Sequence, residues 1–120
     1  MKAVIILVFL CIVYSSGEFV TTLGDCTNYR LVGTSRAYEK AYKNTIRRKT
    51  IKFPTGFHRP DFVIRGIRYS DYETVPSNVT IVKGNLGRRR VWIKIRSQPG
   101  LAIKVLFEFC GEIILRQEND

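Results

Sequence analysis

Few side chains in this sequence have the types and spacing that catalysis requires. His58 is the only histidine, and no cysteine lies near it, so neither a zinc site nor a nucleophile–base pair can be assembled around it. Asp61, Asp71 and Glu73 could supply the acid and base of a glycosidase. However, acidic residues are scattered through the chain, so chance is the better explanation of their proximity. We expect His58 to be an ordinary loop residue and the protein to be no enzyme, with no cofactor and no metal site.

Basic residues form the more informative clusters. Arg47–Lys49, extended by Lys52, is the first cluster. The second is a candidate anion-binding set that carries one tryptophan among its cations: Arg88, Arg89, Arg90, Trp92, Lys94 and Arg96. Trp92, Lys94 and Arg96 alternate along one face of a predicted strand, where the ring could offer a stacking surface for a sugar or a base. The alternative is a solvated face on which Trp92 packs beneath Lys and Arg stems.

The charge balance extends this interpretation to the whole chain. Among 120 residues, 20 are Lys or Arg and 10 are Asp or Glu, which gives a formal net charge of +10. Such a surface favours polyanionic partners, although solubility alone would also explain it. An anionic glycan or an acidic protein fits. Nucleic acid is disfavoured because the sequence contains neither a helical DNA reader nor an aromatic RNA-binding strand motif. Gly84–Gly87 is not a phosphate loop, since no Lys-Ser/Thr follows it.

The N-terminal residues resemble a secretory signal peptide. Lys2 precedes an apolar run from Ala3 to Tyr14, and Ser15–Gly17 provides the small residues of a cleavage site. A membrane-spanning helix needs roughly 20 apolar residues, so this run is too short to be one, and no later segment qualifies. We therefore predict a signal peptide at residues 1–17, a single β domain at residues 18–120, no transmembrane segment in the mature chain, and secretion to the extracellular space.

Removal of such a signal peptide also removes Cys11 and leaves Cys26 and Cys110. In an oxidising compartment these two cysteines are expected to form one disulfide that joins the two ends of the domain. Chain-entropy arguments give a loop of this length about 4 to 5 kcal/mol of stabilisation. Two free thiols or an intermolecular bridge are the alternatives. Asn78 opens an N-glycosylation sequon, Asn78–Thr80, and is predicted to be an accessible acceptor.

Short alternating segments separated by Gly and Pro predict an all-β domain. Arg90–Ser97 and Leu101–Phe109 alternate most clearly, and Gly66 within Asp61–Ser70 is expected to mark a bulge or a close backbone approach. Less regular strands are predicted at Phe19–Leu23, Tyr29–Val32, Tyr38–Tyr42, Arg47–Phe53 and Val79–Lys83, with Gly33 ending the second of these. A helix within Thr34–Ile46 is the alternative, because Tyr38, Tyr42 and Ile46 recur at helical spacing. This spacing indicates one antiparallel β-sandwich or barrel-like domain.

The second half of the chain resembles the multiprotein bridging factor 2 family of insects. The segments that carry the resemblance, in order, are Ile64–Ile67, Asp71, Val79–Ile81, Gly84–Gly87, Val91–Ile95, Ser97–Leu101 and Val105–Gly111. The family pattern has an I-x-x-I strand, an Asp, a Gly-x-x-Gly turn, a V-x-I-x-x-x-S-Q-x-G hairpin and a final apolar strand ending in Gly. The sequence departs from it at Lys83-Gly84, where the family usually has Gly-Gly-x-Gly.

The resemblance implies a small secreted insect protein, of salivary or similar secretory origin, that binds another molecule. The family's founding member is described as a transcriptional co-activator that bridges a nuclear receptor and a general transcription factor, and this is the alternative function. A secreted chain would not meet nuclear factors. A third hypothesis, a cationic membrane-active defence protein, lacks the amphipathic helix that such proteins often use.

Overall fold

A computed structural model describes residues 19–56 and 60–114. The predicted signal peptide and His58 lie outside these ranges. Within the described residues there is no helix of the length and hydropathy that crossing a membrane requires. The secondary structure of this part of the chain consists of strands joined by turns and loops.

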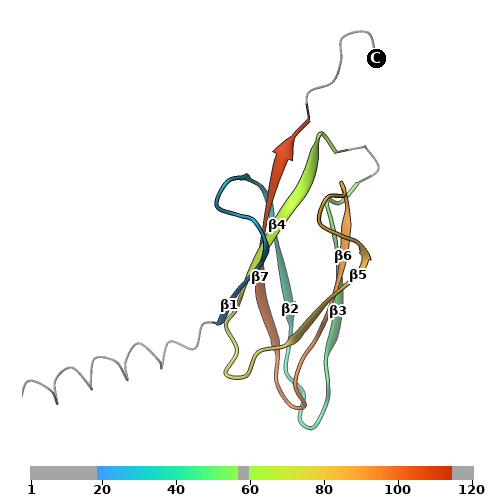
Figure 1. Ribbon diagram of the computed structural model, residues 1–120. Helices are drawn as coiled ribbons and strands as arrows, with labels where there is room; N and C mark the ends of the chain where they lie inside the picture. The colour runs from blue at the N-terminus through green and yellow to red at the C-terminus, as the bar shows by residue number, and fades with distance from the viewer. Residues whose placement is uncertain (1–18, 57–59, 115–120) are drawn as a thin grey trace, which may run out of the picture.

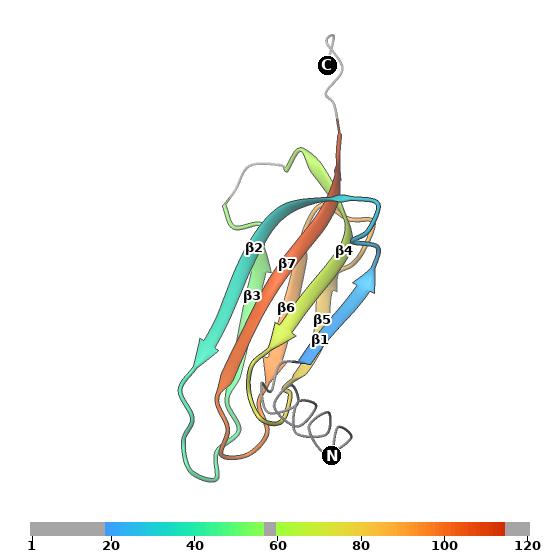
Figure 2. The same cartoon turned by 90° about the vertical axis from the view of Figure 1, so that its left-hand side faces the viewer.

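The strands form two antiparallel sheets that lie face to face (Figures 1 and 2). The first sheet has the order β1-β4-β7-β2 and the second has the order β3-β6-β5. The strand bounds are β1 Phe19–Gly24, β2 Arg30–Glu39, β3 Arg48–Phe53, β4 Phe62–Asp71, β5 Asn78–Gly84, β6 Val91–Arg96 and β7 Ile103–Ile113. The predicted all-β class and antiparallel sandwich are therefore confirmed.

Period-two alternation places the core between the two sheets. Val91, Ile93 and Ile95 of β6 are buried and face the four-stranded sheet. Phe107 and Phe109 of β7 are fully buried on the opposite layer. The Phe53 ring of β3 stacks on Phe109 with a centroid distance of 3.9 Å, which joins the layers directly. Burying one face of each strand leaves its other face to solvent, and this determines which side chains can meet a partner.

β2 differs from the prediction. Tyr29–Val32 and Tyr38–Tyr42 were expected as two strands separated at Gly33, but one strand runs continuously from Arg30 to Glu39. The register shifts between Leu31 and Gly33, so Val32 is the extra residue of a bulge and Gly33 continues the strand opposite Phe109. The Phe53 ring occupies the space that a side chain at position 33 would need. Tyr42 lies beyond the strand, in the turn that leads to β3.

The disulfide and Gly66 together fasten β1 to the sheet. Cys26 and Cys110 are bonded, with their Cα atoms 5.3 Å apart, which confirms the predicted pair. The register of β4 against β7 shifts between Ile64 and Gly66, which confirms the bulge expected at that glycine. A side chain at position 66 would collide with the backbone of Asp25, so the close approach expected there is also present. The loop that follows β1 is thereby held against β4 and β7.

A buried carboxylate organises the connection from the four-stranded sheet to β5. Asp71, at the end of β4, is only 1% exposed. Its two oxygens accept hydrogen bonds from the backbone N–H groups of Glu73, at 3.0 Å, and Ser77, at 2.7 Å. These contacts shape the segment that carries the chain across to Asn78, where β5 begins. The position of β5, and of the side chains that it displays, therefore depends on Asp71.

Candidate anion-binding face

The outward surface of the three-stranded sheet gathers cations from all of its strands. β6 lies between β3 and β5, and its exposed positions alternate with buried ones. Cross-strand pairing places Arg48 and Asn78 beside Arg96, and Thr50 and Thr80 beside Lys94. Lys52 and Lys83 lie beside Trp92. We call this surface the basic face and define it by its cations and its one aromatic ring: Arg48, Lys52, Lys83, Trp92, Lys94 and Arg96.

Trp92 holds two of these cations at one end of the face. The Lys52 Nζ atom lies 4.2 Å from the centroid of the Trp92 ring, and the Lys83 Nζ atom lies 4.6 Å from it. Both distances are within the range of cation–π attraction. The indole is half-buried, and the lysine stems from β3 and β5 flank it. In this arrangement the ring is covered by two lysine side chains. This agrees better with the hypothesis that Trp92 packs beneath basic side chains than with the hypothesis that it offers an open stacking surface.

A polar hollow lies at the other end of the basic face. Its volume is about 480 Å³, and Arg48, Lys94 and Arg96 line it together with Asn78 and Thr80. Three cations, an amide and a hydroxyl converge there. This combination suits a sulfate, phosphate or carboxylate group, because charged and neutral donors can surround its oxygens. Asn78 is exposed and lines this hollow, and its glycosylation remains a prediction.

Acidic residues are missing from this sheet. Neither Asp nor Glu occurs in β3, β5 or β6, all of which the structure describes in full. Within the described part of the chain, none of the five cations of the basic face forms an ion pair. The four-stranded sheet differs, because Arg68 there pairs with Glu108 at 3.8 Å and Arg65 pairs with Glu112 at 2.9 Å. The strands of the four-stranded sheet carry both acidic and basic residues, so the net positive charge is concentrated on the three-stranded sheet.

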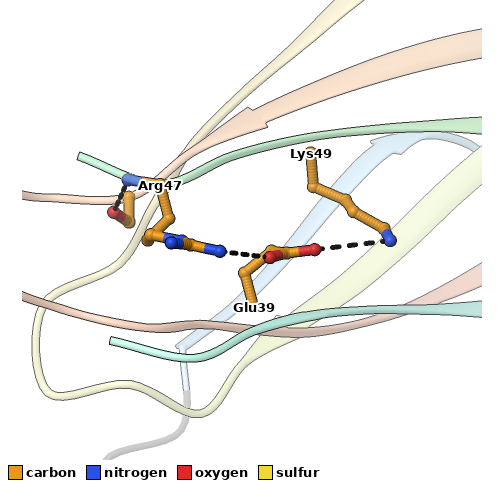
Figure 3. Close-up of polar contacts among 4 residues, drawn as sticks. Glu39, Arg47 and Lys49 are labelled. Atoms are coloured by element: carbon orange, nitrogen blue, oxygen red, sulfur yellow. Dashed lines mark hydrogen bonds and ion pairs between the residues drawn. The ribbon is translucent and has the colours of Figure 1, made fainter. Parts of the chain in front are cut away.

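The first basic cluster of the sequence is divided between two environments. Glu39 at the end of β2 lies between Arg47 and Lys49, with N···O distances of 2.7 and 3.5 Å (Figure 3). The hydrogen bond from Arg47, with help from Lys49, holds the pKa of the Glu39 carboxyl below its usual range. These two cations therefore share one carboxylate at the edge between the sheets. Arg48 and Lys52 alternate with them and point outward, so only they join the basic face.

The three consecutive arginines occupy a different place from the one we expected. They lie in the loop between β5 and β6, and we call Asn85–Arg90 the arginine loop. Arg89 donates a hydrogen bond to the carbonyl of Pro60, and Arg90 donates to the carbonyls of Pro54 and Gly56 at 3.1 and 3.2 Å. Both side chains thus bind the backbone of the β3–β4 connection. Arg88 is exposed, and its carbonyl accepts a hydrogen bond from Ile64.

The structure therefore separates the predicted anion-binding set into two groups. Trp92, Lys94 and Arg96 lie together on the basic face, whereas Arg88–Arg90 precede β6 and line a separate hollow that also reaches Trp92. Sequence reasoning did not assign Lys83 to the site, and it placed Arg48 and Lys52 in a separate cluster. The hairpin turn at Gly84–Gly87 was the available signal, because folding the chain back there brings Lys83 opposite Trp92.

Two further observations complete the description of the site. In residues 19–56 and 60–114, no group of three His, Cys, Asp or Glu side chains is placed to hold a metal ion. No family model, curated protein or solved structure matches this chain. The resemblance to the multiprotein bridging factor 2 family therefore stays a prediction, and the functional argument depends on the geometry.

Proposed function

We propose that the protein is a secreted, non-enzymatic binding protein whose basic face takes an anionic glycan. One observation carries the proposal. Arg48 and Arg96 are direct cross-strand neighbours, and no described carboxylate pairs with either of them. Like charges directly opposite each other destabilise a sheet. An anion bound across this pair would remove the repulsion. Anion binding therefore explains why the two arginines are neighbours, whereas solubility does not require that placement.

The spacing of the cations favours a chain of charges over a single ion. Successive outward residues of a strand lie about 7 Å apart, so Trp92, Lys94 and Arg96 form a track along β6. Lys52, held by Trp92, and Arg48, in the polar hollow, extend this track onto β3. A linear polyanion can place successive sulfate or carboxylate groups on such a track. Release of its counterions would make the binding strongly dependent on salt.

The extracellular location of this activity is part of the proposal. The Cys26–Cys110 bond is consistent with an oxidising compartment. The apolar N-terminal run of the sequence has the pattern of an export signal. An extracellular protein meets sulfated and carboxylated glycans directly, and this agrees with the net positive charge of the three-stranded sheet.

Heparin, a sulfated glycan, is a suitable probe. The double variant Arg48→Ser/Arg96→Ser should leave a heparin column at a clearly lower salt concentration than the unchanged protein. The matched control, Arg30→Ser/Arg36→Ser, removes two exposed arginines from β2 on the other sheet. This control should change the elution only slightly. Circular dichroism would verify that both variants remain folded.

Two results would contradict the proposal. Equal loss of retention in the two double variants would show that heparin responds to net charge and not to the basic face. Unchanged retention in Arg48→Ser/Arg96→Ser would remove this face from consideration. Arg88→Ser tests the arginine loop separately, because Arg88 is its exposed member and its side chain can be shortened without removing the hydrogen bonds of Arg89 and Arg90.

A further inference from the structure

A second concave site lies where the arginine loop meets the ends of β4 and β7. It is a groove of about 690 Å³, a volume within the range of small-molecule sites. Backbone hydrogen bonds build its wall: Ile64 donates to the carbonyl of Arg88 at 2.8 Å, and Gly87 donates to the carbonyl of Ile64 at 2.7 Å. The loop is therefore attached to β4, and the groove is part of the folded structure.

The floor of the groove is apolar. Pro60 is buried, and Val63, Trp92 and Ile114 are half-buried along it. Gly84 and Gly87 also line the groove and contribute no side chains that would fill it. A side chain at position 84 would collide with the backbone of Arg90, so this position stays small. Such a floor favours the hydrocarbon or aromatic part of a ligand, because it removes apolar surface from water.

The rim of the groove is cationic. Lys83 and Arg88 are its exposed charged residues, and Arg89 and Arg90 lie deeper, where they bind backbone carbonyls of the β3–β4 connection. Among the described residues, no Asp or Glu lines this groove. A ligand with a negative head group would therefore meet attraction at the rim and no opposing carboxylate.

From this combination we propose that the groove binds one amphipathic anion: a molecule with an aliphatic or aromatic body and a single carboxylate or sulfate group. The body would lie on Val63 and Ile114, and the head group would face Lys83 and Arg88. This goes beyond glycan binding, since a hydrophilic polyanion has no apolar body to place on the floor. The groove and the basic face share Lys83 and Trp92, but Ile114 belongs only to the groove and Arg96 only to the face.

The intrinsic fluorescence of Trp92 provides a direct assay, because it is the only tryptophan in the chain and it lines the groove. Decanoate, added below its micelle concentration, should change this fluorescence saturably. Decanol has the same chain length without the charge and should bind at least tenfold more weakly. Inorganic sulfate at equal concentration should cause no saturable change. Equal binding of decanol and decanoate would overturn the role of the rim.

Substitution then locates the binding. Ile114→Glu places a carboxylate on the floor while the Ile114 N–H still donates to the carbonyl of Asp61, and it should weaken decanoate binding at least tenfold. Leu31→Glu is the matched control, since Leu31 is an exposed apolar residue of β2, 55% accessible, that does not line the groove. Unchanged decanoate affinity in Ile114→Glu would overturn the proposal.

Two further experiments distinguish amphiphile binding in the groove from glycan binding on the basic face and from binding to a lipid surface. Arg48→Ser/Arg96→Ser should keep decanoate binding even where it loses heparin retention, so the two sites can fail independently. Vesicles of anionic phosphatidylglycerol present the same head-group charge in a membrane. A fluorescence change with these vesicles but none with free decanoate would contradict binding of a single amphiphile and would indicate a lipid surface instead.

Discussion

The Lys52 ammonium lies 4.2 Å from the centre of the Trp92 ring, across the β3–β6 pair. Lys83 approaches the same ring at 4.6 Å from the opposite neighbouring strand. One aromatic side chain thus stabilises two cations on a sheet that carries no acidic residue in β3, β5 or β6, all of them described. The arrangement keeps two like charges close together at the junction of the basic face and the groove.

Removal of these cations should weaken the fold slightly and uncover the ring. Lys52→Ala and Lys83→Ala should each reduce the free energy of unfolding by about 0.5 to 1 kcal/mol, the usual strength of an exposed cation–π contact. Acrylamide should quench Trp92 fluorescence more efficiently in both variants. Lys104→Ala, on the other sheet, is the control and should leave quenching unchanged. If all three variants quench alike, the lysine–tryptophan contacts do not persist in solution.

Asp71 should be among the most sensitive positions in the chain. Asp71→Ala removes the acceptor of two backbone N–H groups and leaves a cavity, so we expect a loss of about 3 kcal/mol in the free energy of unfolding. Chemical denaturation followed by circular dichroism would measure it. Asp61→Ala is the comparison, because the Asp61 side chain is exposed, and it should cost far less. Similar losses for the two variants would refute the structural role of Asp71.

Acidic pH should weaken the connection between the two sheets. Glu73 accepts hydrogen bonds from the backbone N–H groups of Thr74 and Ala102, and these bonds lower the pKa of its carboxyl from the ordinary value of 4.5. The unfolded chain therefore takes up a proton first as the pH falls. The stabilisation is complete above the ordinary pKa and is lost as the pH drops through the lower pKa of the folded state.

The matching variant is Glu73→Gln. The difference in unfolding free energy between the unchanged protein and this variant should be largest at neutral pH and should shrink as the pH falls below the ordinary carboxyl pKa of 4.5. Glu112→Gln removes one charge from β7 without such backbone bonds and serves as the control. A difference for Glu73→Gln that stays constant over this range would contradict the assignment.

The disulfide should supply a large share of the stability. Its cysteines are separated by 84 positions in the sequence, and a loop of that length corresponds to about 4 to 5 kcal/mol of unfolded-state entropy. Cys26→Ser/Cys110→Ser should therefore unfold at a much lower urea concentration. Addition of a reductant to the unchanged protein should reproduce this shift and should not shift the double variant. If neither the double substitution nor the reductant changes the stability, the disulfide does not contribute to it as we expect.

Alternation of apolar and polar residues was enough to predict the fold class and much of the core. Val91, Ile93 and Ile95 were assigned to one face of a strand, and all three are buried. This succeeded because the side-chain period of a strand is two, whatever lies next to it. The prediction failed at Gly33, where a bulge continues β2. In the sequence, a glycine that ends a strand cannot be distinguished from one that follows a bulge, because the Phe53 ring that packs against Gly33 comes from a distant strand.

The composition of the candidate site needed the tertiary structure. The sequence by itself determined that the protein is strongly basic, that Cys26 and Cys110 could pair, and that Trp92, Lys94 and Arg96 share a strand face. Only the folded sheet decided that Lys52 and Lys83 lie on Trp92 and that Arg89 and Arg90 hold the β3–β4 connection. The reason is physical: alternation is local along a strand, whereas cross-strand register and ion pairing depend on residues that are distant in the sequence.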